Sequence, residues 1–217
     1  MISFVWKGYS SVLLNIEDLS ILLDPSNNFT LEELEDLTDK VDIVAYTHEH
    51  SGHFDMDFLM SLIEKYNPYM VVNKGVFRLI RRKVDWDRLF KLKSGEMIEL
   101  EGTRIHALRA VHPGIHPVVF LIEIGGKAIF HGDSTGFTHM FEAFSPVNLA
   151  FVPVGKPSPN ASPKDAIRII KTLSPRVVVP FHGDEREIED LELKVKLANL
   201  NVEVIKPVLG ELTYVQI

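Results

Sequence analysis

The chain has 217 residues, of which 46% are hydrophobic and 24% are charged, a balance typical of a globular protein. It contains no cysteine, which excludes disulfides, thiolate metal ligands and a cysteine nucleophile. Acidic residues outnumber basic ones by 30 to 23, and the formal net charge is −7. This charge argues against a general affinity for nucleic acid or for an anionic membrane.

The amino terminus, MISFVWKGYS, lacks the basic start and long apolar run of a signal peptide. No apolar stretch approaches the roughly 20 residues that a membrane-spanning helix needs. The absence of cysteine fits a reducing compartment. We therefore expect a soluble cytoplasmic protein, and the sequence gives no signal for its oligomeric state.

Short β-rich segments separated by turns open the chain, and strand–helix units follow. The predicted strands are Ile2–Trp6, Ser11–Ile16, Leu19–Leu23, Val41–Tyr46, Tyr69–Val72, Met97–Leu100, Thr103–Ala110, Val118–Ile124, Lys127–Phe130, Leu149–Pro153, Val177–Phe181, Val202–Ile205 and Leu212–Val215. The predicted helices are Thr30–Leu37, a segment after His53, Lys74–Lys83, a segment beginning at Ser162-Pro163, and Asp184–Leu200. The order predicts two similar halves, each with a sheet and helices, within a single domain over residues 1–217. Sheet packed on sheet with helices outside is the expected α/β (α+β) architecture.

Three histidines, His48, His50 and His53, fall within six residues at the end of the strand predicted over Val41–Tyr46. His48 and His50 flank one residue, so in an extended chain their side chains point to the same side. His53 follows a glycine-containing turn and can reach the same place. Converging imidazoles are typical of a site for zinc, iron or manganese. The alternative is a cluster of surface histidines in a loop.

A metal ion needs three or four ligands, so the remaining ones must come from distant segments. His112, Asp133 and His182 each lie at or just after the end of a predicted strand. His116 stands four residues after His112 and is the rival third ligand, although His112 is closer to its strand.

This pattern resembles the metallo-β-lactamase superfamily, whose signature is His-x-His-x-Asp-His, then a histidine, then a Gly-Asp pair, then a final histidine. The matching residues here are His48, His50, His53, His112, Gly132-Asp133 and His182. The opening WKGYSSVLL, followed by Leu22-Leu23-Asp24-Pro25, is similar to the lactonase-like branch of that family. The resemblance covers nearly the whole chain and implies a four-layered αββα sandwich.

The resemblance implies one metal held by His48, His50 and His112, and a second near His53 and His182, with Asp133 bridging the two. Asp133, His182 and His53 would be the catalytic residues. The expected cofactor is one or two zinc ions, with manganese or iron as alternatives. The expected reaction is attack by a metal-activated water on a small-molecule ester, lactone, amide or phosphodiester.

Two positions depart from the family pattern. The family's aspartate, a ligand of the second metal, is Gly52 here, so that site has lost a carboxylate. Asp55 and Glu49 lie nearby, but neither stands at the expected spacing. The histidine frequent in the lactonase-like branch is Tyr9, which could donate a hydrogen bond to substrate or only pack.

The remaining candidates have weaker signals. Asp24 either braces a ligand histidine through its second ring nitrogen or only caps a turn. His131 is expected to be structural, and His106 and His139 have no partner pattern. Two functions compete with the hydrolase: a nuclease of the same superfamily, and a non-catalytic metal-binding or regulatory protein in which Gly52 marks the loss of chemistry.

Overall fold

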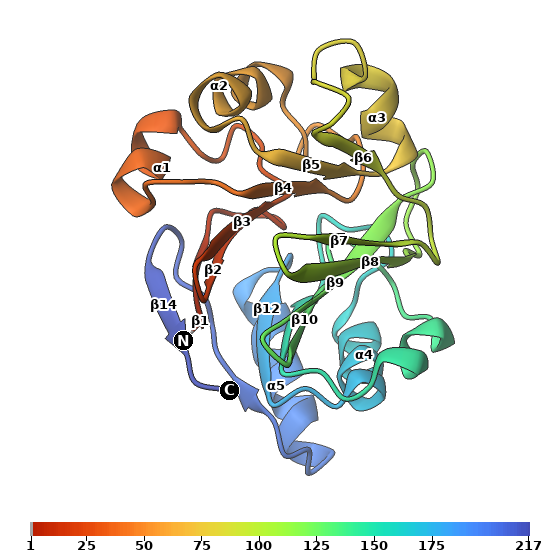
Figure 1. Ribbon diagram of the computed structural model, residues 1–217. Helices are drawn as coiled ribbons and strands as arrows, with labels where there is room; N and C mark the ends of the chain where they lie inside the picture. Colours follow the sequence, from red (N-terminus) through yellow and green to blue (C-terminus); the bar gives the residue numbers. More distant parts are fainter. Residues whose placement is uncertain (1) are drawn as a thin grey trace. The chain divides into compact units, whose positions relative to one another are not determined.

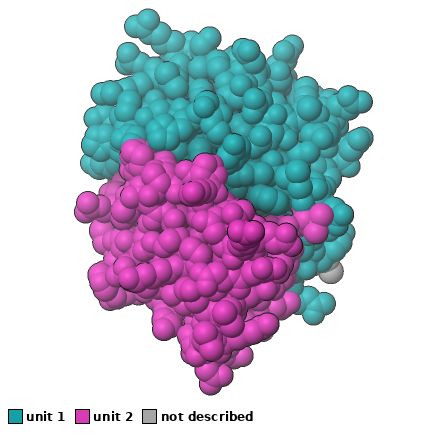
Figure 2. Space-filling model, turned by 180° about the vertical axis from the view of Figure 1, so that it is seen from behind, with its two compact units in different colours: residues 1–93, 114–117, 209–216 teal, residues 94–113, 118–208, 217 magenta. Residues whose placement is uncertain are grey.

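The computed structural model describes residues 2–217 and divides into two compact units (Figure 2). Unit 1 contains the chain up to Lys93, together with Gly114–Pro117 and Leu209–Gln216. Unit 2 contains Ser94–Pro113, Val118–Val208 and Ile217. The expectation of two halves is met, and the assignment of residues 1–217 to a single domain stays a prediction.

Unit 1 is built on a seven-stranded mixed sheet with the order β14-β1-β2-β3-β4-β5-β6. Its strands are β1 (Ile2–Trp6), β2 (Val12–Ile16), β3 (Leu19–Leu23), β4 (Ile43–Tyr46), β5 (Tyr69–Val72), β6 (Leu89–Lys91) and β14 (Leu212–Val215). β14, β1, β2 and β3 pair antiparallel, whereas β3, β4, β5 and β6 pair parallel. The carboxyl end of β4 therefore lies in the parallel half of the sheet, next to the end of β3.

Three helices cover one face of this sheet (Figure 1): α1 (Leu31–Leu37), α2 (Met56–Tyr66) and α3 (Lys74–Ile80). Buried apolar side chains fill the space between, among them Leu34, Leu59 and Ile80 from the helices and Val44 and Met70 from the strands. α1 begins with a capping box, in which the Thr30 hydroxyl accepts the Glu33 N–H and the Glu33 carboxylate accepts the Thr30 N–H. α3 ends three residues before the predicted Lys83, because the chain tightens into a turn in which Lys83 N–H donates to Ile80 O.

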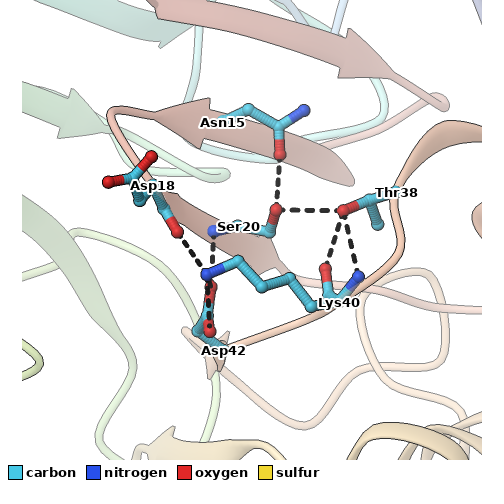
Figure 3. A network of polar contacts seen from close by, with 6 residues as sticks. All are labelled: Asn15, Asp18, Ser20, Thr38, Lys40 and Asp42. Atoms are coloured by element: carbon cyan, nitrogen blue, oxygen red, sulfur yellow. Dashed lines mark hydrogen bonds and ion pairs between the residues drawn. The ribbon is translucent and has the colours of Figure 1, made fainter.

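A polar network fastens the chain at the start of β4 (Figure 3). Ser20 donates its backbone N–H to Asp42 Oδ2 at 2.8 Å and its hydroxyl to Asn15 Oδ1 at 2.8 Å. The Lys40 ammonium donates to Asp42 Oδ1 at 3.2 Å and to the Asp18 carbonyl. The β2–β3 turn and the segment leading into β4 are thus tied together, at the end of β4 opposite to the histidines.

Unit 2 repeats this plan with a second seven-stranded mixed sheet of order β13-β12-β11-β10-β9-β8-β7. Its strands are β7 (Met97–Leu100), β8 (Thr103–Arg109), β9 (Val118–Ile124), β10 (Lys127–His131), β11 (Leu149–Pro153), β12 (Val177–Phe181) and β13 (Glu203–Val204). β7 to β10 pair antiparallel and β10 to β13 pair parallel. Both parallel halves present the carboxyl ends of their strands to loops that carry predicted ligands.

Helices α4 (Pro163–Leu173) and α5 (Glu185–Leu197), with the 3-10 helix η1 (His139–Phe144), cover one face of the second sheet (Figure 1). Ser162 and Asp184 cap α4 and α5, as Ser-Pro and Asp signals predict. α5 ends three residues before the predicted Leu200, and Asn199 follows it with a left-handed φ of 50°.

The fold class is therefore confirmed as α+β, with two mixed sheets and a helical layer for each. The sequence did not predict β6 or η1, which are short elements of three and six residues. Within residues 2–217, no helix is both long enough and apolar enough to cross a membrane.

Truncation of a core residue of α4 should destabilise the protein. Ile169 is fully buried in the unit 2 core, so Ile169→Ala removes apolar contacts and leaves a cavity. We expect the free energy of unfolding to fall by about 2–5 kcal/mol. The matched control is Lys171→Ala on the exposed face of the same helix, which should change it by less than about 0.5 kcal/mol. Chemical denaturation measures both, and an equal effect of the two variants would contradict the assigned helix orientation.

Candidate metal centre

The structure brings the three clustered histidines together at the carboxyl end of β4, within unit 1. The ring of His48 lies 4.6 Å from that of His50 and 4.2 Å from that of His53, between centroids. In each pair a ring nitrogen of one lies within 4.8 Å of a ring nitrogen of the other. His48 and His53 are buried, whereas His50 is exposed. Their donor atoms are close enough to share one metal ion or a closely spaced pair.

A buried carboxylate stands behind two of these rings. Asp24, at the end of β3, is fully buried and accepts the Thr47 N–H at 2.7 Å and the Thr47 hydroxyl at 2.9 Å. The same Thr47 hydroxyl lies 3.0 Å from His48 Nδ1. The Ser10 hydroxyl donates to Asp24 Oδ2 at 3.2 Å and lies 2.5 Å from His53 Nδ1. Asp24 thus contacts two hydroxyl groups, each of which contacts the Nδ1 of His48 or His53, and this arrangement supports the bracing role and not a turn cap alone.

These contacts fix the orientation of the rings. A hydroxyl group occupies Nδ1 of both His48 and His53, so Nε2 is the nitrogen of each ring that is placed to ligate a metal. Metal-binding histidines are typically held in this way, by a hydrogen bond to the other ring nitrogen. The donor set therefore fits a zinc-like ion.

Next to the histidines, the phenol of Tyr46 is fully buried. Burial raises its pKa well above the ordinary value, and the Asp24 and Asp55 carboxylates raise it further. The group therefore stays neutral over the whole working range of a hydrolase. Asp55 itself is the N-cap of α2, where it accepts the Phe58 N–H at 2.8 Å.

Glu49, between His48 and His50, anchors a loop of unit 1. Its carboxylate accepts the Ile115 N–H at 2.8 Å, and Asn73 Nδ2 approaches it at 3.5 Å while donating to the Ile115 carbonyl at 3.0 Å. A side chain at Gly75 would overlap this carboxylate, so any larger residue there would displace the Glu49 side chain. Glu49 therefore holds Gly114–Pro117 against the start of α3.

His116, the rival third ligand, belongs to this loop. It is exposed, and its Nε2 lies 3.5 Å from Lys74 Nζ. Among the described residues, no group of three metal-binding side chains with donor atoms within 4.8 Å of one another includes His116.

Unit 2 presents Asp133 after β10 and His182 after β12, with β11 between these two strands. Asp133 is fully buried, and only 4% of His182 is exposed. The Ser134 hydroxyl lies 3.1 Å from His182 Nε2 and 3.4 Å from Asp133 Oδ1, so it links the two. This contact makes Nδ1 the ring nitrogen of His182 that is placed to ligate a metal.

Close packing of the main chain requires glycine at position 132, immediately before Asp133. A Cβ on Gly132 would lie 2.8 Å from Phe130 Cε1 and 2.9 Å from the Phe151 carbonyl oxygen, which accepts the Gly132 N–H at 2.9 Å. Only glycine allows β10 and β11 to approach this closely at the site.

His112 follows β8 in the same unit. Its neighbour Val111 donates its N–H to the Thr135 hydroxyl at 2.8 Å and accepts the Gly136 N–H at 3.0 Å. The loop that carries Asp133 therefore also fastens the segment that carries His112. Unit 2 thus gathers all three of its predicted ligands around residues 132–136.

A second glutamate braces the loop of His182. Glu187, in the first turn of α5, accepts the N–H groups of Asp184 at 3.0 Å and Lys156 at 3.2 Å. A side chain at Gly155 would coincide with its carboxylate. Glu49 in unit 1 and Glu187 in unit 2 therefore play the same part, holding the loops beside predicted ligands.

Three key residues adopt a left-handed backbone within two residues of the end of a strand. Asp24, Asp133 and His182 have φ angles of 44°, 44° and 47°. Positive φ is uncommon outside glycine, and such strained residues concentrate at functional sites.

The other histidines have structural partners. His131 is buried and packs edge-on against Phe181, with centroids 5.6 Å apart, as its structural interpretation predicted. His106 Nε2 lies 2.9 Å from a Glu123 oxygen. His139 Nδ1 lies 2.8 Å from a Glu142 oxygen.

A pocket of about 570 Å³ lies elsewhere in unit 2, at the opposite ends of β10, β11 and β12. Its lining includes Arg104, Lys127 and Arg176, but no histidine. We therefore place the chemistry at the histidine ends of the strands and not in this pocket.

The chain was compared with known proteins. A family model described as "Beta-lactamase superfamily domain" matches residues 3–182. A UPF0173 protein of Pyrococcus furiosus is 30% identical over 204 residues, which cover 93% of each chain. A UPF0173 metal-dependent hydrolase of Sulfolobus acidocaldarius is 23% identical over 218 residues, covering 93% of this chain and 95% of that one. The chain therefore belongs to the β-lactamase superfamily, within the group of UPF0173 metal-dependent hydrolases.

A solved structure supports the fold. A metallo hydrolase from the archaeon Ignicoccus hospitalis superposes with a TM-score of 0.83 at 21% identity, covering 98% of this chain and 97% of that one. At this identity the likeness concerns the fold, and it confirms the expected metallo-β-lactamase type.

Sequence reasoning missed four residues that contact the predicted ligands or their loops: Ser10, Thr47, Ser134 and Glu187. Their only signals were hydroxyl residues next to predicted ligands and a glutamate in the first turn of a helix.

Removal of the Asp24 carboxylate should weaken both the fold and the metal site. Asp24→Ala leaves the Thr47 N–H and two buried hydroxyls without their acceptor, so the free energy of unfolding should fall by about 2–4 kcal/mol. Metal affinity should fall about 10–100-fold, because His48 and His53 lose their brace.

The matched control for this change is Asp36→Ala, at an exposed position of α1. It should leave both quantities within about 0.5 kcal/mol of wild type. Denaturation and competition titration with a zinc indicator measure the two effects. Unchanged metal affinity in Asp24→Ala would show that the carboxylate has no part in holding the ligands.

Proposed function

We propose that the protein hydrolyses a small-molecule ester, lactone, amide or phosphodiester by means of a metal-activated water. The observation that carries the proposal is the pair of buried, braced ligand sets: His48 and His53 behind the Asp24 carboxylate, and Asp133 with His182 behind Ser134. A stable fold does not require buried donor groups in fixed orientations, so their presence supports a metal site. The family and the names of its relatives point to the same chemistry.

The first metal ion would be held by His48, His50 and His112. Chain connectivity supports the inclusion of His112. In unit 1, a Cβ on Gly114 would lie 3.9 Å from His50 Nε2. His112 stands two residues before Gly114, and two residues of extended chain span at most about 7 Å. This short connection supports the proposal that His112 joins His50, and Glu49 holds the loop to which Gly114 belongs.

His53, His182 and Asp133 would form the second set. Asp133, the one carboxylate among the six predicted ligands, is the residue to bridge two ions. Because Gly52 supplies no carboxylate, this second position should bind more weakly than the first. Zinc is the expected ion, with manganese or iron as alternatives.

A bound divalent ion would bring the pKa of a coordinated water to about 7 and polarise the scissile carbonyl or phosphoryl group. The chain's own contribution is to hold its imidazoles in fixed orientation in a buried place. His53 and His182 could also hold or move a proton where the second ion is absent.

Two other functions would use the same site. A nuclease would need a basic surface, and the net charge of −7 argues against it. A non-catalytic regulatory protein would explain Gly52, but it would not explain why the other six ligand and Gly-Asp positions remain.

Metal stoichiometry tests the proposal. Elemental analysis of the wild type, reconstituted with zinc, manganese or iron, should show at least one equivalent of tightly bound metal. Asp133→Ala should retain less metal, and it should lose hydrolysis of p-nitrophenyl esters or of bis(p-nitrophenyl) phosphate by at least about 100-fold.

Asp190→Ala, which removes a partly exposed carboxylate of α5, is the control and should match the wild type. Absence of metal after every reconstitution would refute the hydrolase and favour a non-catalytic protein. Bound metal with activity only on RNA or DNA would favour the nuclease.

A further inference from the structure

The two positions that depart from the family pattern are in contact with each other. Tyr9 and Gly52 both belong to unit 1, although they are far apart in the sequence. The three heavy atoms nearest to a Cβ built on Gly52 are all in the Tyr9 ring: Cδ2 at 3.9 Å, and Cε2 and Cγ at 4.0 Å. A side chain at position 52 would therefore start directly towards the tyrosine ring.

The backbone does not require glycine at position 52. Its φ is not in the left-handed region, and the Cβ itself would make only ordinary contacts. An aspartate would extend beyond Cβ, and the Tyr9 ring is the nearest group to that Cβ. The main chain does not exclude a side chain here, so the ring is the feature that can restrict one.

The backbone of Tyr9 adopts an unfavourable conformation. Tyr9 has a φ of 45°, in a region that bulky residues rarely adopt. The turn is closed by the Ser11 N–H, which donates to the Gly8 carbonyl at 2.9 Å. Trp6 Nε1 donates to the Tyr9 carbonyl at 2.9 Å. Strain of this kind persists only where the surroundings enforce it, so the backbone of this turn is a built feature, while 42% of the Tyr9 side chain is exposed.

The ring also lies beside a predicted ligand of the second metal. Its centroid is 6.2 Å from that of His53, at an interplanar angle of 53°. Ser10, the next residue of the same turn, contacts His53 Nδ1. One turn therefore both orients His53 and places an aromatic ring next to it.

We propose that Tyr9 and Gly52 act as one pair that sets the number of metal ions: the Tyr9 ring occupies the space that a carboxylate at position 52 would need beside His53. This inference rests on the proposed metal-dependent function. Tyr9 is a positioning residue in this account, because it acts through the space it fills.

The pair predicts that restoring the carboxylate alone is not sufficient. The wild type and Tyr9→Ala should each bind one tight equivalent of zinc, and Gly52→Asp should bind little more. The double variant Gly52→Asp with Tyr9→Ala should bind two equivalents, the second at least about 10-fold tighter than in Gly52→Asp. Elemental analysis and calorimetric zinc titration give both readouts without an activity assay.

A ring-retaining control separates volume from the hydroxyl group. Gly52→Asp with Tyr9→Phe keeps the ring, so it should behave like Gly52→Asp alone. Circular dichroism should show unchanged folding in every variant. If Tyr9→Ala is unstable, Tyr9→Gly replaces it, because glycine adopts a φ of 45° without strain.

The outcomes are distinguishable. Two tight equivalents in Gly52→Asp alone, or in the wild type, would overturn the pairing and leave the metal-dependent function standing. No second equivalent in the double variant would also overturn the pairing. Absence of metal from every variant would refute the proposed function itself.

Discussion

The organisation of the unit 1 ligands depends on one buried carboxylate. Asp24 has no exposure to solvent, and a buried charge is tolerated only when hydrogen bonds satisfy it. Thr47 and Ser10 supply those bonds, and each hydroxyl then contacts the Nδ1 of a histidine. The need to satisfy the carboxylate therefore orients the rings of His48 and His53. A site built in this way is rigid before any ion binds, which is the condition for tight and specific coordination.

Both units position their predicted ligands in the same way. Each places ligands beyond the carboxyl ends of parallel strands, where loops can reach each other without disturbing the sheet. Each also uses a glutamate lodged against a glycine, Glu49 with Gly75 and Glu187 with Gly155, to hold the neighbouring loop. Replacement of either glycine would displace the carboxylate that lies against it, and the loop would lose that hydrogen-bond acceptor.

Much of this could be predicted from the sequence. The buried strands Tyr69–Val72, Leu149–Pro153 and Val177–Phe181 were predicted with their observed bounds, because uninterrupted apolar runs between turn residues have few alternatives. The cluster of His48, His50 and His53 was recognised from the sequence because three histidines rarely fall within six residues. The bracing role of Ser10 was not predictable, since a serine in a turn is ordinary and its contact with His53 spans 43 residues of sequence. The contact between Tyr9 and Gly52 was not predictable for the same reason. The sequence shows two separate positions that differ from the family pattern, and only the fold brings them into contact.

The proposed function makes one central prediction, which is that His48, His50 and His112 bind the same ion. X-ray absorption spectroscopy of the protein loaded with one equivalent of zinc tests it directly, because the spectrum reports the number of imidazole ligands. The account predicts three imidazoles in the wild type and two in His112→Ala, with His116→Ala unchanged at three. An unchanged imidazole count in His112→Ala would contradict the account, because the zinc would then be held without His112.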